Sequence, residues 1–407
     1  MKDFKNDLKL ILSLMVWMII PSIYLLIRMN VVAVNSVDIN ILGQMEWFDL
    51  IDEVITTMLV VPLYSLLSKE KSKYKNGIAF LTSFLIYLLF TIMIVGHITG
   101  ITRFMNAEYA KEYLLLQTIS LIFSFILTFV VLLLTINSDH KLVWILIIVK
   151  VIMLSVCDSI LIGKYKDIGA AYSEILVNVL LSIFSVFLIV SKEYIGLKRT
   201  ELSFFNEWFQ IGKFAGVQIF LDNFIYAIMI VKMVNAVNEA GNYWVANNFI
   251  WGWLLVPVTC FTELIKKNNL PDISFKNTWR YGLMIAGLWV ITMPFWSVFI
   301  NKAMAVDSNQ IMPIVMMSIP FYLTYVVSAF IDAWFISKGK TIYNMIISLI
   351  VNIVYYGIVF ILFKNGLFTM NMNFIIYMFG GGMVAHMILS IILYFVEFNK
   401  ISCNERS

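Results

Sequence analysis

Charged residues are scarce in this sequence. Asp, Glu, Lys and Arg make up 13% of its 407 residues, whereas a soluble domain typically carries about a quarter. Hydrophobic residues make up 61%, so the composition excludes an ordinary soluble domain and predicts a polytopic membrane protein. The net charge of +4 does not indicate a nucleic-acid partner, because the basic residues lie in short loops between apolar stretches.

Cysteine and histidine are also rare. The three cysteines, at Cys157, Cys260 and Cys403, are too scattered for a disulfide framework or a metal site. A membrane enzyme such as an acyltransferase would need a histidine with a catalytic partner, or a metal cluster. The one histidine expected to be buried, His386, adjoins no such motif. We therefore expect neither an enzyme nor an organic cofactor. No signal peptide is expected, because the first apolar stretch is too long and lacks a small-residue cleavage site.

Long apolar stretches dominate the chain. A membrane-spanning helix needs roughly 20 apolar residues. Twelve such helices are predicted, at 9–42, 47–67, 77–97, 113–136, 142–163, 170–191, 204–235, 244–265, 276–301, 310–337, 341–363 and 373–396. Nineteen Lys and Arg residues lie in segments on the N-terminal side of the membrane and six in the opposite loops. This bias predicts a multi-pass protein of the plasma (inner) membrane with both termini in the cytoplasm.

A short internal repeat organises these helices into halves. The sequence Leu-Val-Val-Pro at 59–62 is echoed by Leu-Leu-Val-Pro at 254–257, and each copy closes the second helix of a six-helix block. We predict an all-α fold with two six-helix lobes, 1–200 and 201–407, related by a pseudo-twofold axis along the membrane normal. Transporters are often built this way, with the substrate between the halves.

Two carboxylates lie where apolar residues are expected. Asp158 and Glu174 belong to the predicted helices 142–163 and 170–191, and the short turn between these helices places both acids at a similar depth. A carboxylate in a membrane is costly and usually faces a cavity, a partner or an ion. Two nearby carboxylates repel unless a cation lies between them, so we predict a site for a coupling cation, Na⁺ or H⁺. Asp38, near the outer end of the first helix, is a candidate third member.

The alternative for these two acids is that Lys164 or Lys166 folds back from the turn and neutralises them. Other polar residues inside the helices are candidates for a substrate or proton cavity. Asp222, with Gln218 and Tyr226 at i−4 and i+4, forms a polar stripe in the seventh helix. Asn247, Asn248 and Arg28 complete this set, while Asp52, Glu53 and His386 are secondary candidates. For most of them the alternative is a structural role, such as a hydrogen bond between helices or an acidic helix N-terminus.

Several motifs resemble those of the multidrug and toxic-compound extrusion (MATE) family. They are Asp-Ser-Ile-Leu-Ile-Gly at 158–163, Gly-Ala-Ala-Tyr-Ser-Glu at 169–174, Asp-Ile-Asn-Ile-Leu-Gly at 38–43, Gly-Lys-Phe-Ala-Gly at 212–216 and Ser-Lys-Gly-Lys-Thr at 337–341. The resemblance implies an antiporter that exports organic cations or amphiphilic drugs in exchange for Na⁺ or H⁺ by alternating access. It also implies that Asp38 and Asp158 bind the coupling cation and that Asp222 is the acid of the second lobe. The chain departs from the pattern at Glu174, where the family has threonine.

The second possibility is a flippase of the same superfamily that moves a lipid-linked oligosaccharide or another lipid. Such a protein holds phosphate with basic residues, and Arg28, Lys150, Lys213 and Lys232 are the candidates. Their convergence on one aqueous cavity would favour a flippase, whereas contacts with partners or headgroups would favour efflux. On either reading the expected partners are an amphiphilic small molecule and the lipid bilayer, and the protein is expected to be a monomer.

Overall fold

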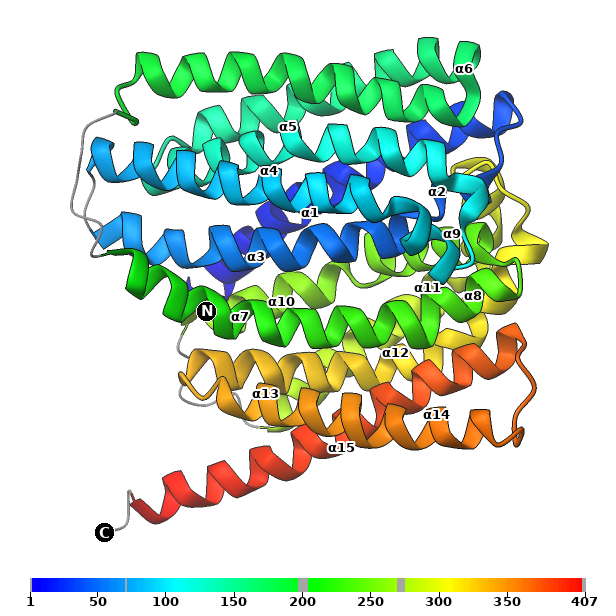
Figure 1. Cartoon of the computed structure of the whole chain (residues 1–407). Helices are drawn as coiled ribbons and strands as arrows, with labels where there is room; N and C mark the ends of the chain where they lie inside the picture. Colours follow the sequence, from blue (N-terminus) through cyan, green and yellow to red (C-terminus); the bar gives the residue numbers. More distant parts are fainter. Residues whose placement is uncertain (1, 70–71, 197–203, 269–274, 405–407) are drawn as a thin grey trace. The chain divides into compact units, whose positions relative to one another are not determined.

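The computed structural model describes residues 2–69, 72–196, 204–268 and 275–404 (Figure 1). Every regular element among these residues is a helix, which confirms the predicted all-α fold. In chain order the elements are α1 (Lys2–Val34), α2 (Ile39–Leu42), α3 (Met45–Lys69), α4 (Lys73–Phe104), η1 (Glu108–Ala110), α5 (Lys111–Ile136), α6 (His140–Ser191), α7 (Phe204–Tyr226), η2 (Ala227–Val231), α8 (Lys232–Ala236), α9 (Ala240–Phe249), η3 (Ile250–Leu254), α10 (Val256–Asn268), α11 (Phe275–Lys302), α12 (Ser308–Ser337), α13 (Ile342–Leu349), η4 (Ile350–Tyr355), α14 (Tyr356–Lys364) and α15 (Met372–Asn404).

Most of these helices suit a membrane. Over the described residues, nine helical segments are long and apolar enough to span one, and the pair formed by Ala240–Leu254 and Val256–Lys266, bent by 51°, makes a tenth. The helix α6 counts once but has two arms, and α1 contributes a shorter apolar stretch, Met18–Val34. Together these segments account for the twelve predicted helices of a multi-pass membrane protein.

The first predicted helix, 9–42, is wrong at its end. The helix α1 stops at Val34, and Ser36 follows in a left-handed conformation with φ of 51°. The chain then restarts at α2, where the Asp38 side chain accepts a hydrogen bond from the backbone N–H of Asn40. Aspartate is a preferred residue at this capping position because its oxygen satisfies a free N–H of the first turn.

Contacts divide the chain into two compact units, Ile27–Ala236 and Met1–Leu26 with Val237–Ser407. In the first unit α5 packs on α3, α4 and α6, and α3 also packs on α7. The Trp208 indole of α7 donates to the carbonyl of Leu59 over 2.9 Å. In the second unit α12 is central and packs on α9, α10, α11 and α15. The predicted lobes, 1–200 and 201–407, stay a prediction.

The helix α6 folds back on itself within the predicted turn. Its reversal lies at Lys166, which has φ of 58° and ψ of −132°, a conformation that is uncommon for a residue with a side chain. Gly169 permits the close return of the second arm, since a Cβ there would lie 2.2 Å from the Leu161 carbonyl oxygen. Asn178 and Ser182 then tie this arm to α5, the first through Ser120 over 2.9 Å. The hairpin fixes Asp158 and Glu174 on facing arms.

Candidate functional site

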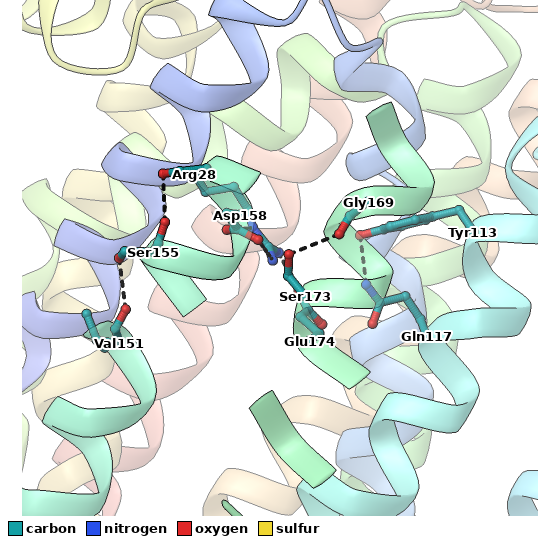
Figure 2. A network of polar contacts seen from close by, with 10 residues as sticks. Arg28, Tyr113, Gln117, Val151, Ser155, Asp158, Gly169, Ser173 and Glu174 are labelled. Carbon is teal, nitrogen blue, oxygen red and sulfur yellow. Dashed lines mark hydrogen bonds and ion pairs between the residues drawn. The ribbon is translucent and has the colours of Figure 1, made fainter. Parts of the chain in front are cut away.

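The guanidinium of Arg28 joins the two hairpin acids (Figure 2). Its Nε donates to Asp158 Oδ2 over 2.9 Å, its Nη2 to Asp158 Oδ1 over 3.2 Å, and its Nη1 to Glu174 Oε1. The Arg28 side chain is 8% exposed, that of Asp158 0% and that of Glu174 20%. Charge-assisted bonds of this kind are among the strongest in proteins. We call these three residues the triad.

Three chain segments supply the triad. Arg28 comes from α1, Asp158 from the first arm of α6 and Glu174 from the second. The neighbouring hydroxyls do not donate to the carboxylates, because each donates to a backbone carbonyl of its own helix. The Ser155 hydroxyl donates to the Val151 carbonyl over 2.8 Å, and the Ser173 hydroxyl donates to the Gly169 carbonyl over 3.0 Å. With all three groups ionised the triad carries one net negative charge.

A second polar pair lies beside the triad on α5. The Gln117 amide nitrogen donates to the Tyr113 hydroxyl over 3.0 Å, and both side chains are buried. Figure 2 shows this pair next to the turn that carries Ser173 and Glu174. Within the described part of the chain the amide oxygen of Gln117 has no hydrogen-bond partner. Lys150 and Asp49 also lie within electrostatic range of Glu174, so the site is a mixed-charge region rather than a purely acidic one.

Asp38 does not meet the triad in this structure. It is exposed at the start of α2, where Oδ1 accepts from the backbone and side-chain nitrogens of Asn40 over 2.9 and 3.0 Å. The Lys166 ammonium, one alternative neutraliser, donates instead to the backbone carbonyl of Asn35 over 2.7 Å. The structure thus brings two of the three predicted cation ligands together, and the role of Asp38 stays a prediction.

The polar residues of α7 contact acids of α3 within the same unit. The Tyr226 hydroxyl donates to Glu46 over 2.9 Å, and the neighbouring Asn223 amide donates to Glu53 over 2.9 Å. Asp52 accepts from the Tyr87 hydroxyl and, over 3.4 Å, from Thr56. Asp222 is half-buried. The side chain of Gln218 lies outside the described residues. These contacts favour the structural alternative for Tyr226, Asp52 and Glu53.

The candidates of the second unit are also hydrogen-bonded. Asn247 accepts from the Tyr322 hydroxyl over 3.3 Å, and Asn248 donates back to the Trp244 carbonyl of its own helix over 2.8 Å. His386 of α15 lies 2.8 Å from Asp332 of α12.

Ser390 also donates to Asp332, over 3.1 Å. The sequence indicated His386 as a single candidate, and nothing in it pointed to Asp332 as its partner. Among the described residues, no three His, Cys, Asp or Glu side chains are arranged to hold a metal ion.

No family model and no curated protein matches this sequence. The fold, however, is similar to solved transporter structures over almost its whole length. An inward-facing multidrug resistance MATE family transporter of the MOP superfamily has a TM-score of 0.72 and 15% identity, covering 95% of this chain and 96% of the other. A mutant MATE transporter from Vibrio cholerae has a TM-score of 0.68 and 14% identity, covering 98% of each chain.

A MOP superfamily transporter from Pyrococcus furiosus, described as having a binding pocket of reversed polarity that suggests a different function, is similar too. The two structures align with a TM-score of 0.61 and 14% sequence identity. The alignment covers 99% of this chain and 97% of the other. At this identity the likeness shows the fold, which is the twelve-helix MATE fold expected from the motifs. The solved proteins named here are transporters and not enzymes.

Proposed function

We propose that this protein is a proton-coupled secondary transporter that exports organic cations or other amphiphilic compounds by alternating access. Its proton site is the triad of Arg28, Asp158 and Glu174. The observation that carries the proposal is the ion network of a buried aspartate, a partly buried glutamate and a buried guanidinium within apolar helices, because such groups are retained in a membrane mainly for function. The similarity of the fold to that of solved transporters supports the transport function.

The charge balance of the triad favours a proton over sodium. A sodium ion would share carboxylate oxygens that already accept from Arg28, and the guanidinium would repel it. A proton needs no such coordination shell and brings the triad from one net negative charge to zero. Within the triad Glu174 holds one Arg28 contact and Asp158 holds two, so exchanging an Arg28 contact for a proton costs fewer hydrogen bonds at Glu174.

Protonation couples to transport through the contact between α1 and the second arm of α6. A neutral Glu174 no longer attracts Arg28 as an ion pair, so the Arg28–Glu174 contact weakens while the Asp158 contact persists. A ligand shifts a conformational equilibrium only by its difference in affinity for the two states. The proton therefore drives transport if the state that releases substrate outward is the one in which Glu174 is separated from Arg28.

The test is transport of a fluorescent lipophilic cation by the purified full chain in proteoliposomes, under separate pH and Na⁺ gradients. We expect uptake driven by a pH gradient in the wild type, uncoupled or lost in Glu174→Gln and strongly reduced in Asp158→Asn. Asp167→Asn is the matched control, because Asp167 lies on the same hairpin outside the triad and should transport normally. Unchanged coupling in both triad variants, or transport driven by Na⁺ alone, would refute the proton site.

The contacts of the basic residues favour export over a flippase. The Arg28 guanidinium is occupied by two carboxylates and is not free to hold a lipid phosphate. The Lys232 ammonium contacts the ring of Phe104, at a place that shares no residue with the triad, and the side chain of Lys213 lies outside the described residues. In the wild-type assay above, a flippase would move a fluorescent anionic phospholipid across the bilayer and leave the lipophilic cation untransported.

A further inference from the structure

The unit Ile27–Ala236 contains a cavity of about 590 Å³, formed by α3, α4, α7 and η2. Its walls are almost entirely apolar and include Leu50, Phe90, Phe104, Phe220 and Phe224. The volume lies in the range of roughly 300–1,000 Å³ found for small-molecule sites. A cavity with such walls suits an alkyl chain, because burying apolar surface is favourable wherever water would otherwise enter.

The cavity opens on a face of the helices that is exposed and apolar. Gly96 and Gly100 of α4 line it, and nothing lies within 4 Å of the position where a Cβ would stand on either residue. The rings of Phe104, Phe220 and Phe224 are about half exposed at its edge. Because α4 is among the most hydropathic of the membrane-spanning helices, this opening faces lipid tails.

One cation stands at the edge of this cavity. The Nζ atom of Lys232, in the membrane-spanning segment Ile219–Ala236, lies 3.5 Å from the ring centroid of Phe104. Among the described residues no carboxylate pairs with Lys232, and the nearby Arg103 is paired with Glu108 over 2.8 Å. The ring contact is favourable, and the ammonium also carries N–H donors that can bind an acceptor. A charged side chain in a membrane usually pairs with a polar or oppositely charged group, so an anionic group is a suitable partner for Lys232.

We propose that this unit carries a binding site for an anionic phospholipid of the bilayer, with an acyl chain in the cavity and the phosphate at Lys232. The apolar walls, the lateral opening and the cation at the edge each match one part of such a lipid. The predicted topology places Lys232 near the outer end of its helix, at the depth of outer-leaflet headgroups. The site shares no residue with the triad, and it does not depend on the proposed transport function.

The test is native mass spectrometry of the full chain in detergent, titrated with phosphatidylglycerol, phosphatidylcholine or glycerol phosphate. We expect one saturable phosphatidylglycerol site in the wild type, with at least tenfold weaker binding of phosphatidylcholine and none of glycerol phosphate. Lys232→Gln should weaken phosphatidylglycerol binding by about tenfold, the usual effect of losing a charge-assisted hydrogen bond. Lys232→Arg should retain it. Gly100→Leu, which fills the cavity, should abolish binding of both lipids.

Two matched variants separate this site from general membrane effects. Lys364→Gln removes another lysine that contacts a phenylalanine ring, that of Phe360 at 5.7 Å, and should bind phosphatidylglycerol like the wild type. Gly357→Leu adds a side chain at a membrane-helix position that is also open but lines no part of the cavity, and should do the same. Equal phosphatidylglycerol binding by wild type, Lys232→Gln and Gly100→Leu would overturn the proposal. Equal binding of the two lipids by the wild type would overturn the role of Lys232.

Discussion

Removing the Arg28 charge is the most direct perturbation of the triad. In Arg28→Gln, the carboxylates of Asp158 and Glu174 lose the guanidinium that offsets their charge. Removing one partner of a buried ion pair costs about 3–5 kcal/mol, because the remaining charge is left without compensation. The upper part of this range applies here, since one guanidinium serves two acids and Asp158 is 0% exposed.

This cost is large enough to measure by thermal unfolding. For a unit of about 200 residues, each kcal/mol shifts Tm by roughly 2–4 °C, so a loss of about 4–5 kcal/mol in Arg28→Gln should lower Tm by about 8–20 °C. The assay is tryptophan fluorescence of the detergent-solubilised chain at one fixed scan rate, because the apparent Tm depends on that rate when unfolding is irreversible.

Two further variants decide whether the loss comes from unpaired charge. Arg103→Gln breaks an exposed pair, with side chains 77% and 59% exposed, and should change Tm little, since solvent screens ion pairs at the surface. The triple variant Arg28→Gln, Asp158→Asn, Glu174→Gln removes every charge of the triad and should regain most of the loss. If Arg28→Gln unfolds at the same temperature as Arg103→Gln, the three side chains do not form a buried ion network.

Three further predictions concern the hairpin turn, the two ends of α6 and the second unit. Gly169→Ala should lower Tm by several degrees because its Cβ meets backbone, while Gly163→Ala, where the added atom has ordinary contacts, should leave Tm unchanged. Hydrogen bonds from Tyr194 and Lys192 lower the pKa of Asp139 below the ordinary value for aspartate. The ionised Asp139 therefore stabilises the fold fully at a pH above the ordinary aspartate pKa, and this stabilisation is lost as the pH falls through the lowered pKa of the folded state. Asp139→Asn should therefore flatten the acid side of the Tm-versus-pH curve, and an unchanged curve would contradict this. His386→Ala should lower the free energy of unfolding by about 1–3 kcal/mol, because Asp332 loses one hydrogen bond. A Tm equal to that of the wild type would show that His386 and Asp332 do not pair.

The sequence predicts the layout of the helices well because length and hydropathy determine it. The reversal at Lys166 lies within the predicted turn, and the short connection is enough to place Asp158 and Glu174 at one depth. The end of the first helix was wrong because apolar residues continue beyond Val34, although the capping preference of Asp38 was a usable signal. Single-sequence periodicity says which residues are apolar and not where a backbone breaks.

The partner of the two acids was beyond such reasoning. The sequence indicated Arg28 only as a residue of the substrate cavity or as a phosphate ligand, and the structure pairs it with residues 130 and 146 positions away. Helix positions estimate a residue's depth in the membrane but do not say which helices are neighbours. The same holds for His386 and Asp332, whose side chains lie 2.8 Å apart although nothing in the sequence indicated that they are partners. Since α12 and α15 have 30 and 33 residues, both exceed the roughly 20 needed to span a bilayer, and counting from their ends misjudges depth.

The pairing of Arg28 gives a physical meaning to the main departure from the family motifs. Glu174 stands where the resemblance leads one to expect threonine, and on its own it would add a second negative charge to a buried site. The guanidinium offsets that charge, so the triad keeps the net charge of a single buried aspartate. We therefore infer that Arg28 and Glu174 are a matched pair. The double variant Arg28→Leu, Glu174→Thr should then have a larger free energy of unfolding than Arg28→Leu alone. We expect a difference of at least about 1.4 kcal/mol, which corresponds to a tenfold change in the unfolding equilibrium constant. Equal stability of the single and double variants would mean that Glu174 does not depend on Arg28 for its charge.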